Sequence, residues 1–329
     1  MPATMRDVAR KAGVSIKTVS RVVNDLGEIS APTRQRVQSV IQELGYRPNV
    51  LARGLVSGES LSIGVLLPKI TDPFFPEVVL GVESVAHQHG YTVFLCNTNA
   101  DPDQELAYID LLAGKQVDGY ILCATRLTEE QIGRVAAQHC VSVLTGRAAV
   151  RAAVVSIPGE AGLREATSHL LRLGHRAVGY AGRAGERVAG YCAALREHGI
   201  AVVEPRMCLL PVASVETGCQ GARELLERAP ELTGIVCYND LVAIGVLQAC
   251  AGLGRRVPQD IAVVGFDDIP MASLVTPKLT TMHVPRHTVG EMAMDLLLRV
   301  MAEQGGYQER LEVPVELVVR ESCGAARGV

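Results

Sequence analysis

The chain has 329 residues, of which 48% are hydrophobic and 20% are charged, and its net charge is −3 at pH 7. This composition is typical of a globular protein of two or three domains and excludes long intrinsic disorder as the main feature. No apolar run approaches the ~18 residues that a membrane helix needs, and the polar start does not resemble a secretion signal. We therefore expect a cytoplasmic protein that does not contact a membrane.

Basic residues are concentrated near the N-terminus. Residues 1–58 carry nine Lys and Arg against four Asp and Glu, although acidic residues outnumber basic ones, 35 to 32, in the whole chain. A small basic segment attached to an acidic body favours contact between that segment and a polyanion. A solvated, charged helix surface would give the same balance.

Nine cysteines lie mostly within apolar stretches, and no C-x-x-C pair occurs among them. This pattern favours small buried thiols in a reducing compartment and indicates neither a zinc site nor a redox pair. The sequence also lacks the G-x-S-x-G, G-x-x-x-x-G-K-[ST], G-x-G-x-x-G and H-E-x-x-H motifs. We therefore expect no metal, no cofactor and no enzymatic activity.

Two short helices are predicted near the N-terminus, joined by a turn that contains Gly13. The first begins with Thr4 and Asp7, which have the spacing of a capping box. The second begins after Ser15, a good N-cap residue, and continues to Asn24. Two short helices joined by a glycine-containing turn form a helix-turn-helix pattern.

The second of these helices has an apolar side, which includes Val19 and Val22, and a polar side. The side opposite these valines carries Ile16 together with the polar residues Lys17, Thr18, Ser20 and Arg21. In this motif the N-terminal end of the second helix enters the major groove of DNA. Lys or Arg can read guanine there, a small apolar side chain can contact the thymine methyl group, and Ser or Thr hydroxyls suit phosphates.

A third helix is predicted over 31–44, with Ser30 as its N-cap and Gly45 at its end. Residues 48–60 follow as a hinge, and its glycines make a helix there weak in isolation. Leu55 in the hinge either wedges into a minor-groove base step or packs against the body, and composition alone favours packing.

Beyond residue 60, short apolar runs alternate with helix-like stretches, which predicts parallel sheets with helices on both faces. The predicted strands are 61–67, 91–96, 119–123, 141–144, 178–181, 234–237 and 261–264, and the predicted helices include 76–89, 105–113, 161–173, 215–228 and 241–253. This length suffices for two sheets with a cleft between them. Ligands of open α/β sheets bind outside the carboxyl ends of the strands.

Several residues that can contact a ligand follow these strands. They are Phe74, Asn97, Arg126, Arg147, Arg187, Asn239 and Asp267. Arginine and aspartate together suit hydroxyl or carboxylate groups through charge-assisted hydrogen bonds. Arg126 and Arg147 near the predicted cleft favour an anionic ligand such as a sugar acid or sugar phosphate. Each residue also fits a surface or helix-capping role.

The motifs MRDVARKAGVS (5–15), TVSRVVN (18–24), LGYRPN (44–49) and ARGL (52–55) continue into the body as SIGV (62–65), DPFF (72–75) and GFDD (265–268). Many residue types at fixed spacing make this combination very specific. Over nearly its whole length the chain therefore resembles the LacI/GalR, or lactose-repressor-type, family of bacterial transcriptional regulators.

The resemblance implies a homodimer whose two helix-turn-helix heads bind a palindromic operator DNA. It assigns base reading to Ile16, Lys17 and Arg21, and it places Leu55 in the central base step, which reverses the preference from composition. The DNA-binding residues that we expect are Thr4, Ser15, Ile16, Lys17, Thr18, Ser20, Arg21, Asn24, Asn49, Ala52 and Leu55.

For the body, the resemblance implies a fold like that of periplasmic sugar-binding proteins, with the chain crossing between two subdomains more than once. It matches Phe74, Arg187, Asn239 and Asp267 to effector-contacting positions. Together with Arg126 and Arg147, these residues form the predicted effector site. The chain departs from the family pattern at 156–159, in a short loop over 179–187 and at Gly146. These departures indicate an effector other than a standard hexose.

We therefore predict an all-α helix-turn-helix DNA-binding head (1–47), a hinge helix and linker (48–60), and an α/β, periplasmic-binding-protein-like body for effector binding and dimerisation, built of two parallel-sheet subdomains (61–329). The predicted function is sequence-specific repression of a carbohydrate-related operon, released by a small-molecule inducer. A corepressor-dependent repressor, an activator and a regulator without effector sensing remain open. An architectural DNA protein would not need so large a body, and a free sugar-binding protein would not need the basic head.

Overall fold

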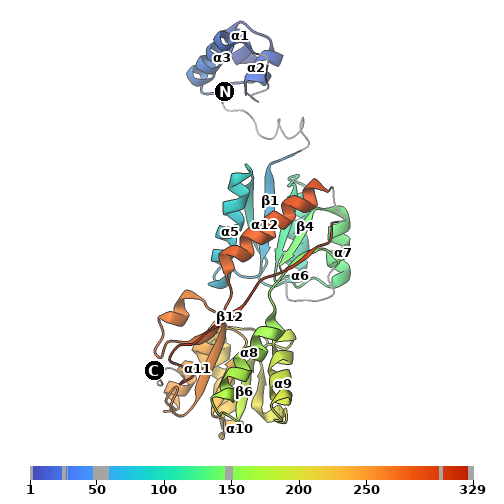
Figure 1. Cartoon of the computed structure of the whole chain (residues 1–329). Helices are drawn as coiled ribbons and strands as arrows, with labels where there is room; N and C mark the ends of the chain where they lie inside the picture. The colour runs from blue at the N-terminus through green and yellow to red at the C-terminus, as the bar shows by residue number, and fades with distance from the viewer. Residues whose placement is uncertain are drawn as a thin grey trace. The chain divides into compact units, whose positions relative to one another are not determined.

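The computed structural model describes residues 3–23, 27, 29–46, 59–144, 151–303 and 307–324. It divides the chain into two compact units, Met1–Leu61 and Ser62–Val329, which contain the predicted head and body (Figure 1). Most of the predicted hinge and the boundary at residue 47 lie outside the described residues, so these boundaries stay predictions. Within the described residues, no helix is long and apolar enough to cross a membrane.

In its described part, the head contains α1 (Met5–Ala12), α2 (Ile16–Val23) and α3 (Ala31–Leu44). Gly13 ends α1 with a φ of 65°, a left-handed conformation that favours glycine. The apolar sides of the helices meet in one core of Val8, Ala9, Ala12, Val19, Val22, Val37, Val40 and Tyr46. This core holds α2 with its other side facing outward.

Two of the three predicted helix caps form as expected. The Thr4 hydroxyl accepts a hydrogen bond from the Asp7 amide at 3.3 Å, and the Asp7 carboxylate accepts one from the Thr4 amide at 3.0 Å. Ser15 Oγ accepts from an amide in the first turn of α2 at 3.0 Å. Ser30 differs, because at the N-cap of α3 its hydroxyl donates to the Thr33 hydroxyl at 2.9 Å and caps no amide.

The first sheet of the body has the strand order β11-β5-β4-β3-β1-β2, and its paired strands are all parallel. Its strands are β1 (Ser62–Leu67), β2 (Thr92–Asn97), β3 (Gly119–Cys123), β4 (Val141–Leu144), β5 (Ala153–Ser156) and β11 (Arg310–Glu312). One face carries α5 (Phe74–Gln88) and α12 (Arg286–Ala302), and the other carries α6 (Pro102–Ala113) and α7 (Glu129–Gln138). Helices on both faces explain why the central strands are continuous apolar runs.

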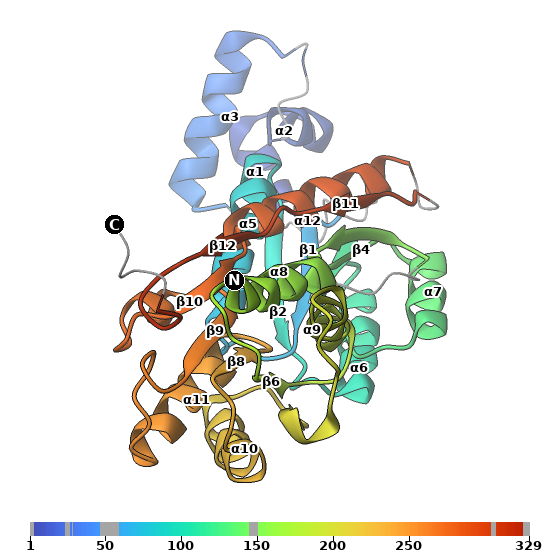
Figure 2. The ribbon, with the colours of Figure 1, turned by 60° about the horizontal axis from the view of Figure 1, so that its bottom comes forward.

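The second sheet has the strand order β12-β10-β9-β8-β6-β7, and it is parallel except where β12 runs antiparallel to β10. Its strands are β6 (Val178–Gly182), β7 (Met207–Leu209), β8 (Gly234–Cys237), β9 (Ala262–Asp267), β10 (Thr280–His283) and β12 (Glu316–Val318). Helices α8 (Gly159–Arg172) and α9 (Glu186–Glu197) pack on one face, and α10 (Val215–Arg228) and α11 (Asp240–Gly252) on the other (Figure 2).

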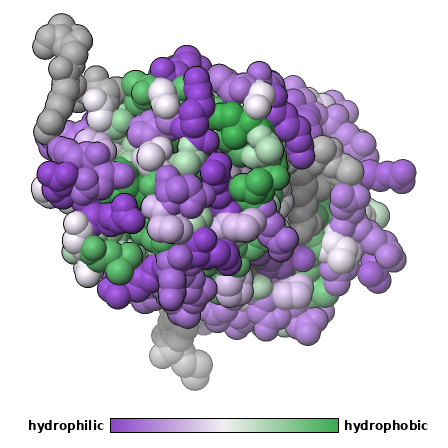
Figure 3. Space-filling model, turned by 90° about the horizontal axis from the view of Figure 1, so that it is seen from below, coloured by the Kyte–Doolittle hydropathy of each residue, from purple (hydrophilic) through white to green (hydrophobic). Residues whose placement is uncertain are grey.

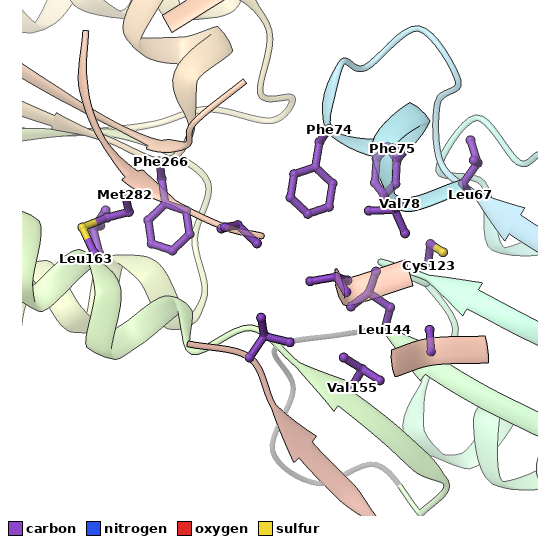
Figure 4. Close-up of a cluster of buried hydrophobic side chains, with 14 of the residues drawn as sticks. Leu67, Phe74, Phe75, Val78, Cys123, Leu144, Val155, Leu163, Phe266 and Met282 are labelled. Carbon is purple, nitrogen blue, oxygen red and sulfur yellow. The ribbon is translucent and has the colours of Figure 1, made fainter. Parts of the chain in front are cut away.

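The chain passes between the sheets after β5, after β10 and after β11, which confirms the predicted repeated crossing. Helix α12 follows β10 of the second sheet but packs against α5 and against β3, β4 and β5 of the first. One cluster of buried apolar side chains takes members from both sheets, among them Phe74, Val155, Phe266 and Met282 (Figure 4). The predicted two-subdomain α/β fold is confirmed.

The surface differs from this interior. Figure 3 shows one face of the molecule, on which hydrophilic side chains predominate and apolar groups are small and scattered. All nine cysteines are free thiols, and six of them are buried, as predicted. Burial raises the pKa of Cys123 to about 12, so this thiol stays protonated and unreactive.

Candidate functional site

The outer side of α2 presents apolar and basic groups together. Ile16 is 46% exposed and Lys17 is exposed beside it, whereas Val19 is completely buried in the head core. The side chains of Thr18, Ser20 and Arg21 are half-buried. A methyl-bearing and a cationic side chain in the first helical turn match the chemistry of thymine and guanine edges.

Three of the four charged side chains of α1 form ion pairs within the head. Arg10 pairs with Asp7, and Lys11 Nζ lies 2.6 Å from Glu43 Oε1 of α3. Hydrogen bonds from Thr4, followed by the charge of Arg10, lower the pKa of Asp7. These pairs engage charges of α1 within the head, whereas α2 presents Ile16 and Lys17 outward.

The structure describes seven of the predicted DNA-binding residues. Thr4 and Ser15 lie at the N-terminal ends of α1 and α2, where their hydroxyls act as caps, and the other five lie on α2. The remaining four lie outside the described residues, namely Asn24, Asn49, Ala52 and Leu55.

In the body, four predicted effector residues follow the carboxyl ends of strands, as open α/β sheets require of a ligand site. Phe74 begins α5 after β1, Arg187 lies in the first turn of α9 after β6, Asn239 is the N-cap of α11 after β8, and Asp267 ends β9. We call these residues and their direct neighbours the inter-sheet site, which consists of Asp72, Phe74, Arg187, Tyr238, Asn239, Phe266 and Asp267.

Two hydrogen bonds and two ring contacts hold the guanidinium of Arg187. Its Nη2 donates to Asp267 Oδ1 at 3.0 Å, and its Nη1 donates to the Tyr238 carbonyl oxygen. Its guanidinium carbon lies 3.8 Å from the ring centroid of Phe266 and 4.6 Å from that of Tyr238. The cation therefore contacts two aromatic rings, and together with its hydrogen bonds these contacts fix its orientation before any ligand binds.

Asp267 is strained and buried, as residues at functional sites often are. Its φ is 104°, a conformation that non-glycine residues adopt only when their surroundings hold them in it. Burial raises the pKa of Asp267 to about 6, against the opposing charge of Arg187, and the charge of Asp72 adds to the increase. Asp72, in the segment after β1, therefore interacts electrostatically with Asp267 of the second sheet.

Phe74 approaches this site from the first sheet. Its ring packs edge-to-face on Phe75, with 5.3 Å between the ring centroids, and only a small part of it remains exposed. Figure 4 shows Phe74 and Phe266 on opposite sides of the space between the two sheets. The Asp72 carboxylate accepts a hydrogen bond from the Phe74 amide at 3.0 Å, which orients the start of α5.

Asn239 and the neighbouring Asp240 have supporting contacts. Asn239 Oδ1 accepts from the Val242 amide at 3.0 Å and caps α11. Asp240 is completely buried, and its carboxylate accepts from the Thr281 hydroxyl at 2.6 Å and from the Ile269 amide at 2.8 Å. Burial raises the pKa of Asp240 well above its usual range. Its two hydrogen bonds tie α11 to the segment after β9 and to β10.

A second ion cluster lies beside Asp267. Asp268 accepts from Arg320 Nη2 at 2.7 Å through one oxygen and lies 2.9 Å from His283 Nδ1 through the other. Arg320 also donates to the Leu279 carbonyl oxygen at 2.8 Å. This cluster ties the end of β9 to β10 and to the C-terminal segment.

Two further effector residues were predicted after strands of the first sheet. Arg126 follows β3 of the first sheet, where its amide donates to Glu105 at 3.2 Å, and Arg147 lies outside the described residues. Asn97 was expected to follow the second strand, but it is the last residue of β2, and its Oδ1 accepts from the Ile70 amide.

Sequence reasoning missed Tyr238 and Phe266 as members of the site. The signal was present, because each aromatic residue directly precedes a predicted polar residue at a strand end.

Two family models match the chain and cover almost all of it. Residues 4–49 match the model of bacterial regulatory proteins of the lacI family, and residues 60–321 match the model of periplasmic binding proteins and the sugar-binding domain of the LacI family. The chain therefore belongs to the LacI family. It is an effector-responsive, DNA-binding regulator of transcription and not an enzyme.

Curated relatives match over nearly their full length. The regulator RegA of Clostridium saccharobutylicum is 34% identical over 331 residues, which covers 98% of this chain and 99% of the relative. The ribose operon repressor of Halalkalibacterium halodurans is 35% identical, with 97% and 96% covered. The repressor CytR of Escherichia coli is 34% identical, with 98% and 97% covered.

Solved structures extend this similarity. A lac repressor dimer bound to operator and the anti-inducer ONPF matches with a TM-score of 0.88 at 29% identity, with 98% of this chain and 99% of that chain covered. A CelR–cellobiose complex matches with a TM-score of 0.74 at 28% identity, with 97% and 99% covered. A LacI-family regulator of Enterococcus faecium with bound ribose matches with a TM-score of 0.70 at 29% identity, with 79% and 98% covered.

Proposed function

We propose that this chain represses a carbohydrate-related operon and releases the DNA when a small-molecule inducer binds at the inter-sheet site. The observation that carries this proposal is the Arg187–Asp267 pair, which is buried at the carboxyl end of β9 and whose arginine contacts two aromatic rings. A guanidinium and a carboxylate side by side offer a donor and an acceptor, which suits neighbouring hydroxyl groups of a sugar.

Phe74 supplies an apolar ring against which the carbon face of a sugar ring can stack. Asn239, with an amide that can donate and accept, extends the polar side of the site. Arg126 and Arg147 add positive charge from the first subdomain and favour a sugar acid or sugar phosphate. Three related proteins support a carbohydrate ligand, since they are a ribose operon repressor, a regulator with bound ribose and a regulator in complex with cellobiose.

On the DNA, we propose that two heads bind the half-sites of a palindromic operator. Ile16, Lys17 and Arg21 read base edges, and the hydroxyls near the helix starts contact phosphates. Leu55 wedges into the central base step and stabilises a kinked duplex. The full proposed set is Thr4, Ser15, Ile16, Lys17, Thr18, Ser20, Arg21, Asn24, Asn49, Ala52 and Leu55.

The body offers a surface for self-association at the edge of the first sheet. The edge strand β2 exposes Phe94 (41%) and Leu95 (43%), and the adjoining helix α5 exposes Leu80 (50%). Apolar side chains on an open sheet edge are a liability unless another chain covers them. A second copy of this chain is the proposed partner, in line with the related lac repressor, which binds its operator as a dimer.

The switch follows from the composition of the inter-sheet site, which takes Phe74 from the first sheet and Arg187 and Asp267 from the second. A ligand that contacts both sheets changes the angle between them, because it favours the arrangement that it binds more tightly. Strand β1 is the first strand after the hinge, so a movement of the first sheet is transmitted along the chain to the hinge.

The test starts with the DNA. The full chain selects sites from a random-sequence pool, and fluorescence anisotropy then measures affinity for the selected site with sugars, sugar acids and sugar phosphates. We expect a palindromic consensus and an affinity that falls when the inducer is added. Phe74→Leu keeps apolar volume but loses the ring, so it should bind DNA normally and respond weakly.

Each other outcome contradicts the proposal in a defined way. Tighter DNA binding with a compound would make that compound a corepressor. A chain that selects a consensus and responds to no compound would be a regulator without carbohydrate sensing. A pool that yields no consensus would overturn sequence-specific repression itself.

A further inference from the structure

Arg286 is a cation at the junction between the two sheets. It is the first residue of α12 and directly follows Val284 and Pro285, which carry the chain from β10 of the second sheet to this helix of the first. Its Nη1 is buried, and within the described part of the chain it has no hydrogen-bond partner. The residue as a whole is only partly buried, but a buried N–H donor without an acceptor is rare, because it loses its hydration and gains nothing in exchange.

The charge of Arg286 acts on the inter-sheet site. It is one of the charges that lower the pKa of Asp267, alongside that of Arg187. Asp267 is already joined to Arg187 by the 3.0 Å ion pair. The strand register places His283, three residues before Arg286, opposite Asp267. Arg286 is therefore a second cation near this carboxylate, and the described protein atoms leave its Nη1 donor unused.

We propose that Arg286 binds an oxyanion of the effector, a carboxylate or a phosphate, next to the Arg187–Asp267 pair. This inference rests on the proposed function, because it assumes that the effector occupies the inter-sheet site. A guanidinium presents several N–H groups in one plane and binds planar carboxylate or phosphate oxygens with two hydrogen bonds. The N-terminal end of α12, where Arg286 lies, adds a favourable partial positive charge.

The position of Arg286 gives this contact a second consequence. An effector whose hydroxyls bind the Arg187–Asp267 pair and whose anion binds Arg286 touches the second sheet at α9 and β9 and the first sheet through α12. A charged ligand would then connect the two subdomains through Arg286 as well as through Phe74, whereas its neutral analogue would connect them through Phe74 alone. We therefore expect an anionic ligand to operate the switch more strongly than its neutral analogue.

The experiment uses the full chain and two groups of probes. Inorganic phosphate is titrated against chloride at equal ionic strength, and melting temperature reports binding. Glucose, gluconate and glucose 6-phosphate are then compared by isothermal titration, so that a carboxylate and a phosphate are tested on one carbon skeleton. The variants are Arg286→Gln, Arg286→Lys and the control Arg299→Gln at the far end of α12, where Arg299 pairs with Glu309.

We expect phosphate to raise the melting temperature of the unmodified chain and of Arg299→Gln, but not that of Arg286→Gln. An anionic sugar should bind the unmodified chain more tightly than glucose, and Arg286→Gln should lose about ten- to a hundredfold in that affinity, the factor of one charged hydrogen bond. Arg286→Lys keeps the charge and should retain part of the phosphate response, which guards against a variant that fails to fold.

A phosphate response that is absent, or equal in the unmodified chain and Arg286→Gln, would overturn the inference. If neutral sugars bind and release DNA while anions do not bind, the oxyanion site fails and the proposed function stands. If phosphate binding depends on Arg286 but no carbohydrate changes DNA affinity, the oxyanion site stands and the proposed function fails.

Discussion

Arg187 and Asp267 are 80 residues apart in the chain, yet they form a 3.0 Å ion pair in which the side chains are only 11% and 9% exposed. Removing one member leaves the other charge buried without a partner. We expect Arg187→Met to lower the free energy of unfolding at pH 7 by about 3–5 kcal/mol, measured by urea denaturation. The exposed pair of Arg172 and Glu165 provides the control, and Glu165→Gln should cost less than about 1 kcal/mol. Equal losses in the two variants would contradict this assignment.

The raised pKa of Asp267 predicts that the free energy of unfolding depends on pH. Burial raises this pKa from its ordinary 3.8 to about 6, so the folded chain binds the proton more tightly than the unfolded chain does. The contribution of this group to stability is therefore complete below about pH 4 and is lost as pH rises through 6. Denaturation at pH 4, 5, 6 and 7 should show a slope in this window that Asp267→Asn lacks. Parallel curves for the two proteins would refute the prediction.

Helices α5 and α12 cross at two glycines. A Cβ atom on Gly81 would lie 2.0 Å from the His287 carbonyl oxygen, and one on Gly290 would lie 2.0 Å from the Val78 carbonyl oxygen. We expect Gly81→Ala to destabilise the body by about 1–3 kcal/mol in denaturation experiments, because the helices must separate. Gly133 of α7 has nothing within 4 Å, so Gly133→Ala should instead stabilise it by up to about 1 kcal/mol. The same sign for both substitutions would be inconsistent with this crossing.

Arg21 is the proposed guanine reader on α2. We expect Arg21→Ala to reduce discrimination by about 1–3 kcal/mol at one position per half-site, measured as relative affinities for a set of single-base operator variants. Arg36 lies exposed on α3, so Arg36→Ala should leave the base preference unchanged. If Arg21→Ala instead reduces the affinity equally for every DNA sequence, Arg21 contacts a phosphate and not a base.

Phe94 tests the proposed dimer surface. A charge at this exposed position of the edge strand β2 should prevent a second copy from covering it, so we expect Phe94→Glu to halve the molar mass in light scattering and to weaken operator binding. Leu173, at the end of α8, is similarly exposed, and Leu173→Glu serves as the control that keeps the dimer. A Phe94→Glu protein with unchanged mass would place the interface elsewhere.

Much of the fold could be predicted because its signals are local. Buried parallel strands such as β3 and β8 are continuous apolar runs, and caps such as Thr4 define helix starts. Strand β11 could not be recognised, since Arg310–Glu312 is only three residues long, has two charged members and becomes a strand only by pairing with β5. The same holds for β12, which is short and set by its antiparallel partner β10.

The site divides in the same way. Arg187, Asn239 and Asp267 could be selected because each follows a recognisable strand. The ring of Tyr238 beside Arg187 and the link between Asp268 and Arg320 depend on tertiary packing over 51 and 52 residues of chain, respectively, which no local pattern encodes. The orphaned Nη1 of Arg286 is likewise visible only once its surroundings are known.

The three crossings between the sheets also determine the order in which the parts of this protein fold during synthesis on the ribosome. The last residue of the head core is Tyr46, so the head can fold once this residue has been synthesised. The first sheet is complete only after β11, which ends at Glu312, and the second only after β12, which ends at Val318. Domains fold as units once their residues have emerged. Each nascent chain therefore folds its DNA-binding head early and its effector-binding body only at the end of synthesis. A chain that is truncated before β11 would have a folded head but an incomplete effector-binding body.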